Sequence, residues 1–485
     1  MALFDLTNNI FFFNTTIFTI SFFLITSLCF SVRFSTNSNF AFPVLLKTSN
    51  GITFFLLFMI FCLFCSDFVF SNNFYFFSQN FQLLFFVVFL LVFLVSYDFQ
   101  AARSVTKFEL DFLFICVILS GICLCFTDDF LLFYIAVEFQ SLTFYIIATF
   151  NRNSEFSTEA GLKYFIFGAL ISCFLLFGLF LIYLNFGLTS FELLFSLAST
   201  EQDSFLFFGL LFLFIVLLFK IGAAPFHLWV CDVYDGSMLN VTMFFAALPK
   251  IIMFSILIKL FFSSLFDFHV ILKTLLLFAS LLSITIGTFS AIYQKRIKRL
   301  FAYSAIAHTG FILLGFISNS AESSKATIAY ILIYALMTIL LFSLLILASI
   351  STNNNPKYLA NWTSFGSKNY LFAISFTLIL FSIAGIPPLA GFFSKFFVLL
   401  TAVSNGYYFS SFYIIFISSI ACFYYIRLIK MFFFTKFSKN SFWLANSAKK
   451  NTDGILALLM FFNLAFFLKP EFVSHFATVI AFSVV

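Results

Sequence analysis

The chain has 485 residues, of which 63% are hydrophobic and only 9% are charged, and its formal net charge is +6. Soluble domains carry about 25% charged residues, so this chain has too little polar surface to cover globular domains in water. The composition therefore excludes an ordinary soluble protein and indicates one that uses the lipid bilayer as its solvent.

Apolar stretches recur along the whole chain. A helix needs about 20 apolar residues to cross a bilayer. Fourteen stretches approach or exceed this length, although the second and the last look short. They lie near 10–31, 51–66, 82–97, 109–126, 129–150, 160–184, 204–229, 238–263, 271–291, 301–317, 326–350, 370–402, 411–434 and 453–468. We therefore predict an all-α polytopic membrane protein with about fourteen transmembrane helices.

The basic residues of the loops test this count. When the loops are assigned alternately to two sides, one side receives sixteen Lys and Arg residues and the other receives three. The first set is Arg33, Lys47, Arg103, Lys107, Arg152, Lys163, Lys295, Arg296, Lys298, Arg299, Lys357, Lys368, Lys436, Lys439, Lys449 and Lys450. The second set is Lys273, Lys325 and Lys469. The positive-inside rule then predicts that the basic loops face the matrix or cytoplasm and that both termini face the opposite side.

The cysteines and the N-terminus carry little chemistry. Of the nine cysteines, all but Cys231 lie in apolar stretches. Cys62 and Cys65 form a C-x-x-C, but no His or further Cys lies nearby. We interpret them as small apolar side chains and expect no metal site. The first residues also lack the Arg- and Ser-rich pattern of a transit peptide.

Charged residues inside the apolar stretches are the strongest functional signal. Glu138 is the one carboxylate that we place in the middle of a span. Six cations also lie within spans. Three of these lie near span ends, where long side chains can reach the headgroups: Lys259, Arg427 and Lys430. Three others cannot easily reach the surface: Lys220, Lys250 and Lys395.

A charge at the bilayer centre costs at least ~2.5–3.5 kcal/mol, so such residues usually face protein or water and serve a function. A Glu–Lys pair that only ties helices together is the structural alternative. Three lysines against one acid leave cations in surplus, which favours proton transfer. Burial lowers the pKa of a lysine and a nearby carboxylate raises it, so a lysine whose acidic partner moves away can release a proton.

Two of the predicted helices are interrupted beside buried lysines. In the seventh span, GAAP follows Lys220 directly, and in the twelfth, Pro387, Pro388 and Gly391 precede Lys395. Proline breaks inside a membrane are tolerated where the freed backbone groups are buried in protein or line a wet cavity, although a plain kink is the alternative for each.

The two breaks are five spans apart, so equivalent segments would cross in opposite directions. We therefore predict two inverted five-helix repeats, in which helices 7 and 12 are the interrupted ones. The predicted divisions are 1–108 for the first three spans, 109–263 and 264–434 for the repeats, and 435–485 for a basic loop and the last span.

Four motifs resemble a known family. They are STEAGLKYFIFGAL at 157–170, FKIGAAPFHLWVCDVYDG at 219–236, AIYQKRIKRLFAYSAIAHTGFILLG at 291–315 and AGIPPLAGFFSKF at 384–396. In order and spacing over 109–434, they resemble the chain 2 family of NADH–ubiquinone oxidoreductase (respiratory complex I), one of its antiporter-like subunit families. Fourteen spans resemble the long form of that chain. Chains 4 and 5 usually read LPKAH after the tryptophan of the seventh span, whereas VCDVYDG follows Trp229 here.

The resemblance assigns roles to the buried charges. Glu138 would be the essential carboxylate of the fifth span and Lys220 its neighbour on the seventh. Lys250 would be the central relay, and Lys395 would lie near the proton exit.

Three further residues match the family less decisively. Lys163 matches a basic position at the start of the sixth span, and His227 matches a histidine after the seventh-span break, so both join the proton path as secondary candidates. An interfacial or structural role is the alternative for each. His308 falls in the matching tenth-span stretch, and its alternative role is to satisfy backbone groups.

The resemblance implies a proton-translocating subunit driven by quinone reduction elsewhere in the complex. The chain has no Walker loop, dinucleotide-binding glycine loop or iron–sulfur cysteine set. NADH, flavin, iron–sulfur clusters and ubiquinone are therefore expected in other subunits, and NADH:ubiquinone reductase activity belongs to the complex. The implied partners are chain 4, small membrane-arm subunits and specific phospholipids, with no nucleic acid.

The implied location is the mitochondrial inner membrane, with both termini in the intermembrane space. Three alternatives remain open on the residues alone. They are a subunit of a multisubunit cation/proton antiporter, a subunit of the homologous plastid complex, and a scaffold without a proton path.

Overall fold

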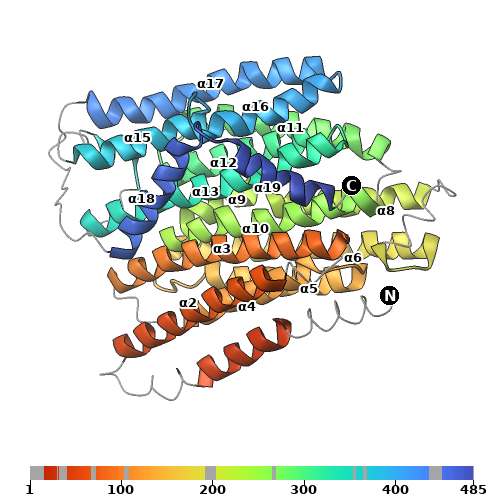
Figure 1. Ribbon diagram of the computed structural model, residues 1–485, viewed down its shortest axis with the longest axis horizontal. Coiled ribbons are helices and arrows are strands. Elements are labelled where there is room, and N and C mark those ends of the chain that lie inside the picture. The colour runs from red at the N-terminus through yellow and green to blue at the C-terminus, as the bar shows by residue number, and fades with distance from the viewer. Residues whose placement is uncertain are drawn as a thin grey trace.

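Helices that run roughly along one common direction make up the computed structural model (Figure 1). The structure describes residues 16–29, 31, 41–66, 73–102, 109–191, 204–264, 269–352, 357–363, 369–435 and 450–483. Several features discussed above lie outside these residues: positions 10–15 of the first span, Arg33, Arg103, Lys107, Lys368, Lys436, Lys439, Lys449 and the side chains of Lys47, Cys65 and Lys450.

The first described helix covers 16–29. It is followed by α2 (Ala41–Ser66), α3 (Asn73–Ala102), α4 (Glu109–Cys125), α5 (Phe130–Ala148), α6 (Glu155–Phe186), α8 (Ser204–Ile221), α9 (Leu228–Gly236) and α10 (Leu239–Lys259), which ends in a π-helical turn, η2 (Leu260–Ser264). The chain continues through α11 (His269–Tyr293), α12 (Ile297–Gly315), α13 (Ala321–Thr352), a 3-10 turn, η3 (Leu359–Trp362), α15 (Tyr370–Ala384), α16 (Ala390–Ser404), α17 (Tyr408–Phe433), α18 (Lys450–Ala465) and α19 (Glu471–Phe482).

The prediction of an all-α membrane protein is confirmed. Among the described residues, seven helices are long and apolar enough to cross a membrane by themselves. They are Phe76–Ala102, Phe130–Ala148, Glu155–Phe186, Leu239–Phe262, Leu272–Tyr293, Ala321–Ile350 and Tyr408–Phe433. Helix α6 and helix α17 turn large apolar side chains outward, such as Phe180 and Phe412, which are 50% and 72% exposed. Such surfaces suit lipid and are unfavourable in water.

The predicted interruptions are present as pairs of helices. The seventh predicted span consists of α8 and α9, and the twelfth consists of α15 and α16. The last predicted span, 453–468, coincides with α18, and a further short helix, α19, follows it beyond the predicted span. The sequence FLKPE at 467–471 ends the apolar run with a charged residue and a proline, so hydropathy alone stops there.

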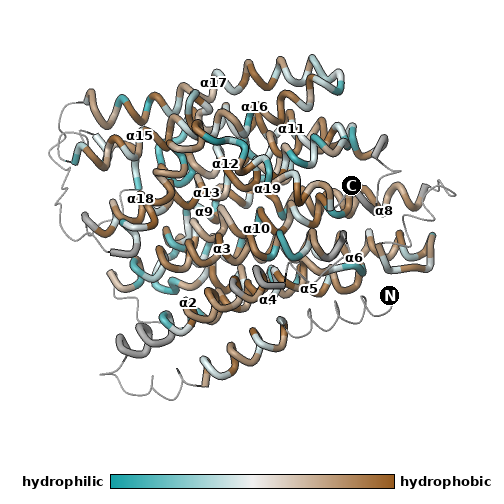
Figure 2. The backbone as a smooth tube through the Cα atoms, viewed as in Figure 1, coloured by the Kyte–Doolittle hydropathy of each residue, from teal (hydrophilic) through white to brown (hydrophobic). Residues whose placement is uncertain are grey.

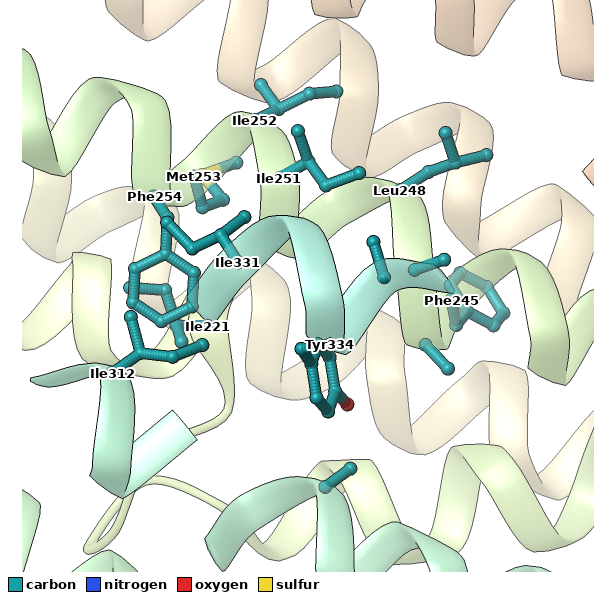
Figure 3. Packing of buried hydrophobic residues seen from close by; sticks show 14 of the residues in the cluster. Ile221, Phe245, Leu248, Ile251, Ile252, Met253, Phe254, Ile312, Ile331 and Tyr334 are labelled. Atoms are coloured by element: carbon teal, nitrogen blue, oxygen red, sulfur yellow. The ribbon is translucent and has the colours of Figure 1, made fainter. Parts of the chain in front are cut away.

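Helix α10 lies at the centre of the bundle, and every residue from Leu239 to Lys259 is buried. Figure 3 shows its apolar side chains packed beside those of three other helices, including Ile221 of α8, Ile312 of α12 and Tyr334 of α13. The centre of the bundle therefore joins the two halves of the chain. Figure 2 shows that hydrophilic residues interrupt the hydrophobic helices in the interior as well as at their ends.

Candidate functional site

The first break lies directly after Lys220, which occupies the last turn of α8 and is only 8% exposed. Gly222 ends the helix in the left-handed region (φ +78°), and a Cβ there would lie 2.5 Å from Val230. Only glycine fits both the dihedral angle and the close approach. Trp229 of α9 donates an indole hydrogen bond of 2.9 Å to the Phe219 carbonyl, which satisfies an acceptor at the open end of α8.

Glu138 lies near this break without being tied to it. It is half-buried on α5, with Ser141 Oγ 3.4 Å from its Oε2 atom. Its Oε1 atom is buried and has no hydrogen-bond partner among the described residues. Glu138 interacts electrostatically with Lys220, but no ion pair within 4.0 Å joins them in the described part of the chain. The two charges therefore attract each other without direct contact.

Lys250 joins the two halves of the bundle at the centre. Its Nζ atom donates hydrogen bonds to the Ala305 carbonyl of α12 (3.1 Å) and to the Tyr334 hydroxyl of α13 (2.9 Å). The ammonium also lies 4.8 Å from the centroid of the Tyr334 ring. A buried ammonium needs such partners to offset its lost hydration.

The proline before Lys250 has a specific backbone consequence. Pro249 lies inside α10 and has no N–H to donate to the Phe245 carbonyl one turn earlier. The Tyr234 hydroxyl donates to that carbonyl instead, at 3.2 Å. The backbone around the central lysine is therefore satisfied by a side chain from α9.

A small cavity with a mixed apolar and polar lining lies between Lys250 and the second break. Its volume open to the centres of water molecules is about 30 Å³, roughly enough for two waters at about 10–15 Å³ each. Its polar lining consists of Ser304, His308, Tyr330, Tyr334, Thr338 and Ser394. Water could therefore continue the polar connection from α10 toward α16.

His308 is the charged or ionisable group of this cavity that interacts electrostatically with both Lys250 and Lys395. Its Nδ1 atom shares a hydrogen bond of 2.8 Å with the Tyr330 hydroxyl, and its ring centroid lies 5.5 Å from that of Tyr334. The partner of the Nδ1 atom is therefore a side chain, whereas the alternative role considered for His308 was to satisfy backbone groups.

The second break places Lys395 against the end of the preceding helix. Lys395 of α16 is buried, and its Nζ atom donates a hydrogen bond of 2.7 Å to the Ala384 carbonyl, the last residue of α15. Gly385 has a φ of +87°, and a Cβ there would lie 2.9 Å from Lys395 Cδ. The carbonyl end of a helix carries partial negative charge, which favours a cation at this position.

The two secondary candidates lie at one end of the site. Lys163 has a side chain that is 42% exposed, and it pairs with Glu159 (2.8 Å) and Asp232 (3.2 Å). Arg299 of α12 pairs with the same Asp232 at 3.3 Å. His227 is buried at the start of α9, inside the first break. The structure thus brings Lys163 into an interfacial charge cluster and His227 next to the broken helix.

The same charge cluster ties α9 to α12. Arg299 Nε lies 3.0 Å from Asp235, and Arg296 also pairs with Asp235. These contacts join an element of the first predicted repeat to an element of the second, at the end of the bundle that carries the basic loop 295–299.

One expectation about charges is wrong. Lys259 was expected to extend toward lipid headgroups, but it is buried and donates to the Thr127 carbonyl (2.6 Å) and to Asp128. The loop between α4 and α5 covers the Lys259 ammonium. The sequence could not reveal this contact, because it joins segments that are far apart in the chain. Two other carboxylates, Asp98 and Asp111, are buried more deeply than the half-buried Glu138, with exposed fractions of 5% and 1%.

These two aspartates hold helix ends. Asp111 accepts a hydrogen bond of 3.3 Å from Gln100. Asp98 accepts one of 2.9 Å from the backbone N–H of Thr452, in the first turn of α18. They lie at the edges of apolar stretches, where hydropathy does not distinguish a buried carboxylate from a solvated one.

Sequence reasoning missed the tyrosines of the site. Tyr330 and Tyr334 lie in the stretch IAYILIYALM of α13, where they are the polar side chains of an otherwise apolar run. Their four-residue spacing places both on one face of the helix. This spacing of two tyrosines in an apolar helix could have indicated a polar face in the interior. In the described part of the chain, no group of three or more His, Cys, Asp or Glu side chains could hold a metal ion.

Comparison with known proteins agrees with this architecture. The family described as NADH:quinone oxidoreductase/Mrp antiporter, transmembrane, matches residues 127–423. The NADH-ubiquinone oxidoreductase chain 2 of Marchantia polymorpha is 36% identical over 462 residues, which cover 92% of both chains. The NADH-quinone oxidoreductase subunit N 1 of Rhizobium meliloti is 36% identical over 336 residues, which cover 69% of this chain and 70% of that one.

A solved structure shows the same arrangement of helices. A chain of respiratory complex I from Thermus thermophilus with bound aureothin is 26% identical, with a TM-score of 0.75, over 93% of this chain and 98% of that one. The chain therefore belongs to the NADH:quinone oxidoreductase/Mrp antiporter family and, within it, to the group formed by NADH-ubiquinone oxidoreductase chain 2 and NADH-quinone oxidoreductase subunit N.

Proposed function

We propose that this chain translocates protons as an antiporter-like membrane-arm subunit of NADH:ubiquinone oxidoreductase, along a path formed by Glu138, Lys220, Lys250 and Lys395. The observation that carries this proposal is the central connection from Lys250 through Tyr334 and the small cavity beside it toward Lys395. A scaffold would not need buried lysines that, among the described residues, have no carboxylate within 4.0 Å, nor a hydroxyl group and a space for water between two of them.

The first step belongs to Glu138 and Lys220. Opposite charges attract strongly in a low-dielectric interior, so the carboxylate favours the charged form of the lysine. Separation of the two groups removes that attraction, and the lysine then releases its proton. The lack of a close ion pair between them supports a separable pair.

The next step has to cross an apolar region. No hydrogen bond among the described residues joins Lys220 to Lys250. Their chain neighbours Ile221 and Ile251 belong to one packed apolar cluster (Figure 3). We infer that water must enter this region before a proton can pass, which makes it the point where the movement is controlled.

The last step runs from Lys250 to Lys395. The Tyr334 hydroxyl accepts from Lys250, and the cavity beside it is lined by His308 and Ser394. Hydroxyl groups and water both donate and accept hydrogen bonds, so they can pass a proton along a chain. Lys163 and His227 would serve the matrix end, near the first break.

The two breaks support the inverted-repeat organisation. In each, a glycine in the left-handed region ends the first half-helix, and a proline follows within three residues. We propose repeats at 109–263 and 264–434, preceded by the spans in 1–108 and followed by the region 435–485. In this arrangement fourteen spans cross the membrane, the last of them composed of α18 and α19.

The complex supplies what this chain does not bind. We assign NADH, flavin, iron–sulfur clusters and ubiquinone to other subunits, and we propose neighbouring chain 4, small membrane subunits and phospholipids as contacts. The proposed location is the mitochondrial inner membrane, with both termini in the intermembrane space. The names of the relatives and the charge distribution of the loops support this placement.

A cation/proton antiporter subunit is the second candidate, because the matching family includes Mrp antiporters. Purification of the native assembly through a tag on this chain separates the two functions. We expect flavin- and cluster-bearing subunits and NADH:ubiquinone reductase activity to purify with the chain. An assembly that lacks redox subunits and exchanges cations for protons would favour the antiporter.

A further inference from the structure

The helix α18 is fastened at both ends to other parts of the bundle. Near its start, the Thr452 N–H donates to Asp98 of α3. Asn463, about 16 Å further along the helix, is 3% exposed and reaches the second break. Its Oδ1 atom accepts hydrogen bonds from Ser382 Oγ of α15 (2.9 Å) and from the Ala390 N–H of α16 (3.3 Å).

One oxygen atom therefore holds both halves of the interrupted helix. The first N–H groups of a helix have no partner within it and need an acceptor from elsewhere. At the start of α16 the residue in the N-cap position is Leu389, whose side chain makes no capping bond. Asn463 supplies the missing acceptor from a helix about seventy residues later in the chain.

The bond to Ser382 fixes the other side of the break. Ser382 lies two residues before Ala384, whose carbonyl accepts from Lys395. The two half-helices also approach closely, since a Cβ at Gly391 would lie 1.9 Å from the Ser382 carbonyl oxygen. The spacing between the end of α15 and the start of α16 determines whether the Lys395 ammonium meets its acceptor.

At both breaks, a side chain of the second half-helix bonds to the first. At the first break, the Trp229 indole of α9 donates to the Phe219 carbonyl of α8, and at the second, Lys395 of α16 donates to the Ala384 carbonyl of α15. Among the described residues, an additional anchor from α18 is found only at the second break. Helix α18 lies outside both predicted repeats and outside the residues matched by the family.

We propose that Asn463 is a positioning residue of the proton path, which clamps α15 to α16 and so keeps the Ala384 carbonyl against the Lys395 ammonium. The functional consequence rests on the proposed role of Lys395 as a proton carrier. The clamp itself rests only on the hydrogen bonds, so the two parts can be tested separately.

The test uses the intact complex with Asn463→Leu, which keeps a side chain of similar size and removes the acceptor. Asn405→Leu is the matched control, because Asn405 is exposed at the other end of α16 and donates only to the nearby Thr401 carbonyl (2.7 Å). Hydrogen–deuterium exchange of peptides covering 382–395 reports on the clamp. The pH dependence of the NADH:ubiquinone rate and the proton-to-electron ratio report on Lys395.

We expect Asn463→Leu to assemble and to exchange at least about tenfold faster across the break, whereas Asn405→Leu exchanges as the unaltered protein does. The alkaline limb of the pH–rate profile should move to lower pH, because the ammonium loses the acceptor that stabilises it. Besides Lys395, the titratable groups that act there are His308 of α12 and Cys422 of α17, which the substitution leaves in place.

Unchanged exchange across the break in assembled Asn463→Leu would overturn the clamp. Faster exchange with an unchanged pH profile would overturn the positioning role. If Asn463→Leu does not assemble, Ser382→Ala removes one of the two bonds from the other side, and the same two outcomes decide the proposal. Lys395→Met provides the separate test of the underlying function, since normal pumping in that variant would remove Lys395 from the path whatever the exchange data show.

Discussion

Lys250 on α10 donates a hydrogen bond of 2.9 Å to the hydroxyl of Tyr334 on α13. The two residues are 84 positions apart and belong to different predicted repeats. Together with the bond from Lys250 to the Ala305 carbonyl, it links the two predicted repeats directly at the centre of the bundle, and the ammonium also lies against the tyrosine ring. Movement of either helix would therefore change the surroundings of the central lysine.

Tyr334→Phe should slow proton transfer without disturbing the core. The ring keeps its packing, while the hydroxyl that accepts from Lys250 is lost. A hydrogen bond to a charged group contributes about 1.5–3 kcal/mol, so we expect at least a roughly tenfold loss of turnover. The measurement is the NADH:ubiquinone rate of purified complex in proteoliposomes. Tyr293→Phe, at an 81% exposed position, is the control and should leave the rate unchanged.

Two buried lysines on α10 should behave differently when they are replaced. Lys250→Met removes a carrier and should abolish pumping in a complex that still assembles. Lys259→Met removes the contacts with Thr127 and Asp128, so it should lower the melting temperature and leave the proton-to-electron ratio unchanged. Thermal unfolding of both complexes beside their pumping ratios makes the distinction. A loss of pumping in Lys259→Met at normal assembly would count against the assignment.

Lys163 should have a modest effect. Its ion pairs with Glu159 and Asp232 are partly exposed, and such pairs contribute about 0–1 kcal/mol. We expect Lys163→Met to slow turnover about twofold, with less effect at high salt, where the pairs are already screened. The proton-to-electron ratio should stay constant. A lower proton-to-electron ratio would show that Lys163 carries protons, contrary to this prediction.

Much of the fold could be predicted because the signals were local. Long apolar stretches, prolines and glycines at the breaks, and lysines in apolar surroundings are all visible in the sequence. Glu138, Lys220, Lys250 and Lys395 were found in this way, and their roles remain predictions.

The missed features depend on contacts between distant segments. Nothing in the local sequence distinguishes Asn463, because its role depends on the packing of α18 against the second break. Lys259 lies at a span end, where lysines usually reach the lipid headgroups, and only the folded structure shows that the loop at 127–129 covers it. Tyr334 looks like one more aromatic residue in a chain with 23% aromatic residues. The α19 helix was missed because Lys469 and Pro470 end the apolar pattern, although α19 packs along α13 in the structure.

We infer that Glu138 controls the protonation of Lys220. Glu138→Gln keeps the size of the side chain and removes its charge, so the lysine loses the partner that favours its ammonium form. Glu138→Asp keeps the charge with a shorter reach and should be milder. If Glu138 only ties helices together, Gln should instead loosen assembly while each assembled complex pumps normally.

The most direct measurement is the proton-to-electron ratio of assembled Glu138→Gln complex, taken together with its ubiquinone-reductase rate. We predict full assembly, a lower ratio and, if electron transfer is tightly coupled to pumping, a rate reduced by about tenfold or more. Full assembly with an unchanged ratio and an unchanged rate would show that Glu138 does not control the protonation of Lys220 and would remove it from the proton path.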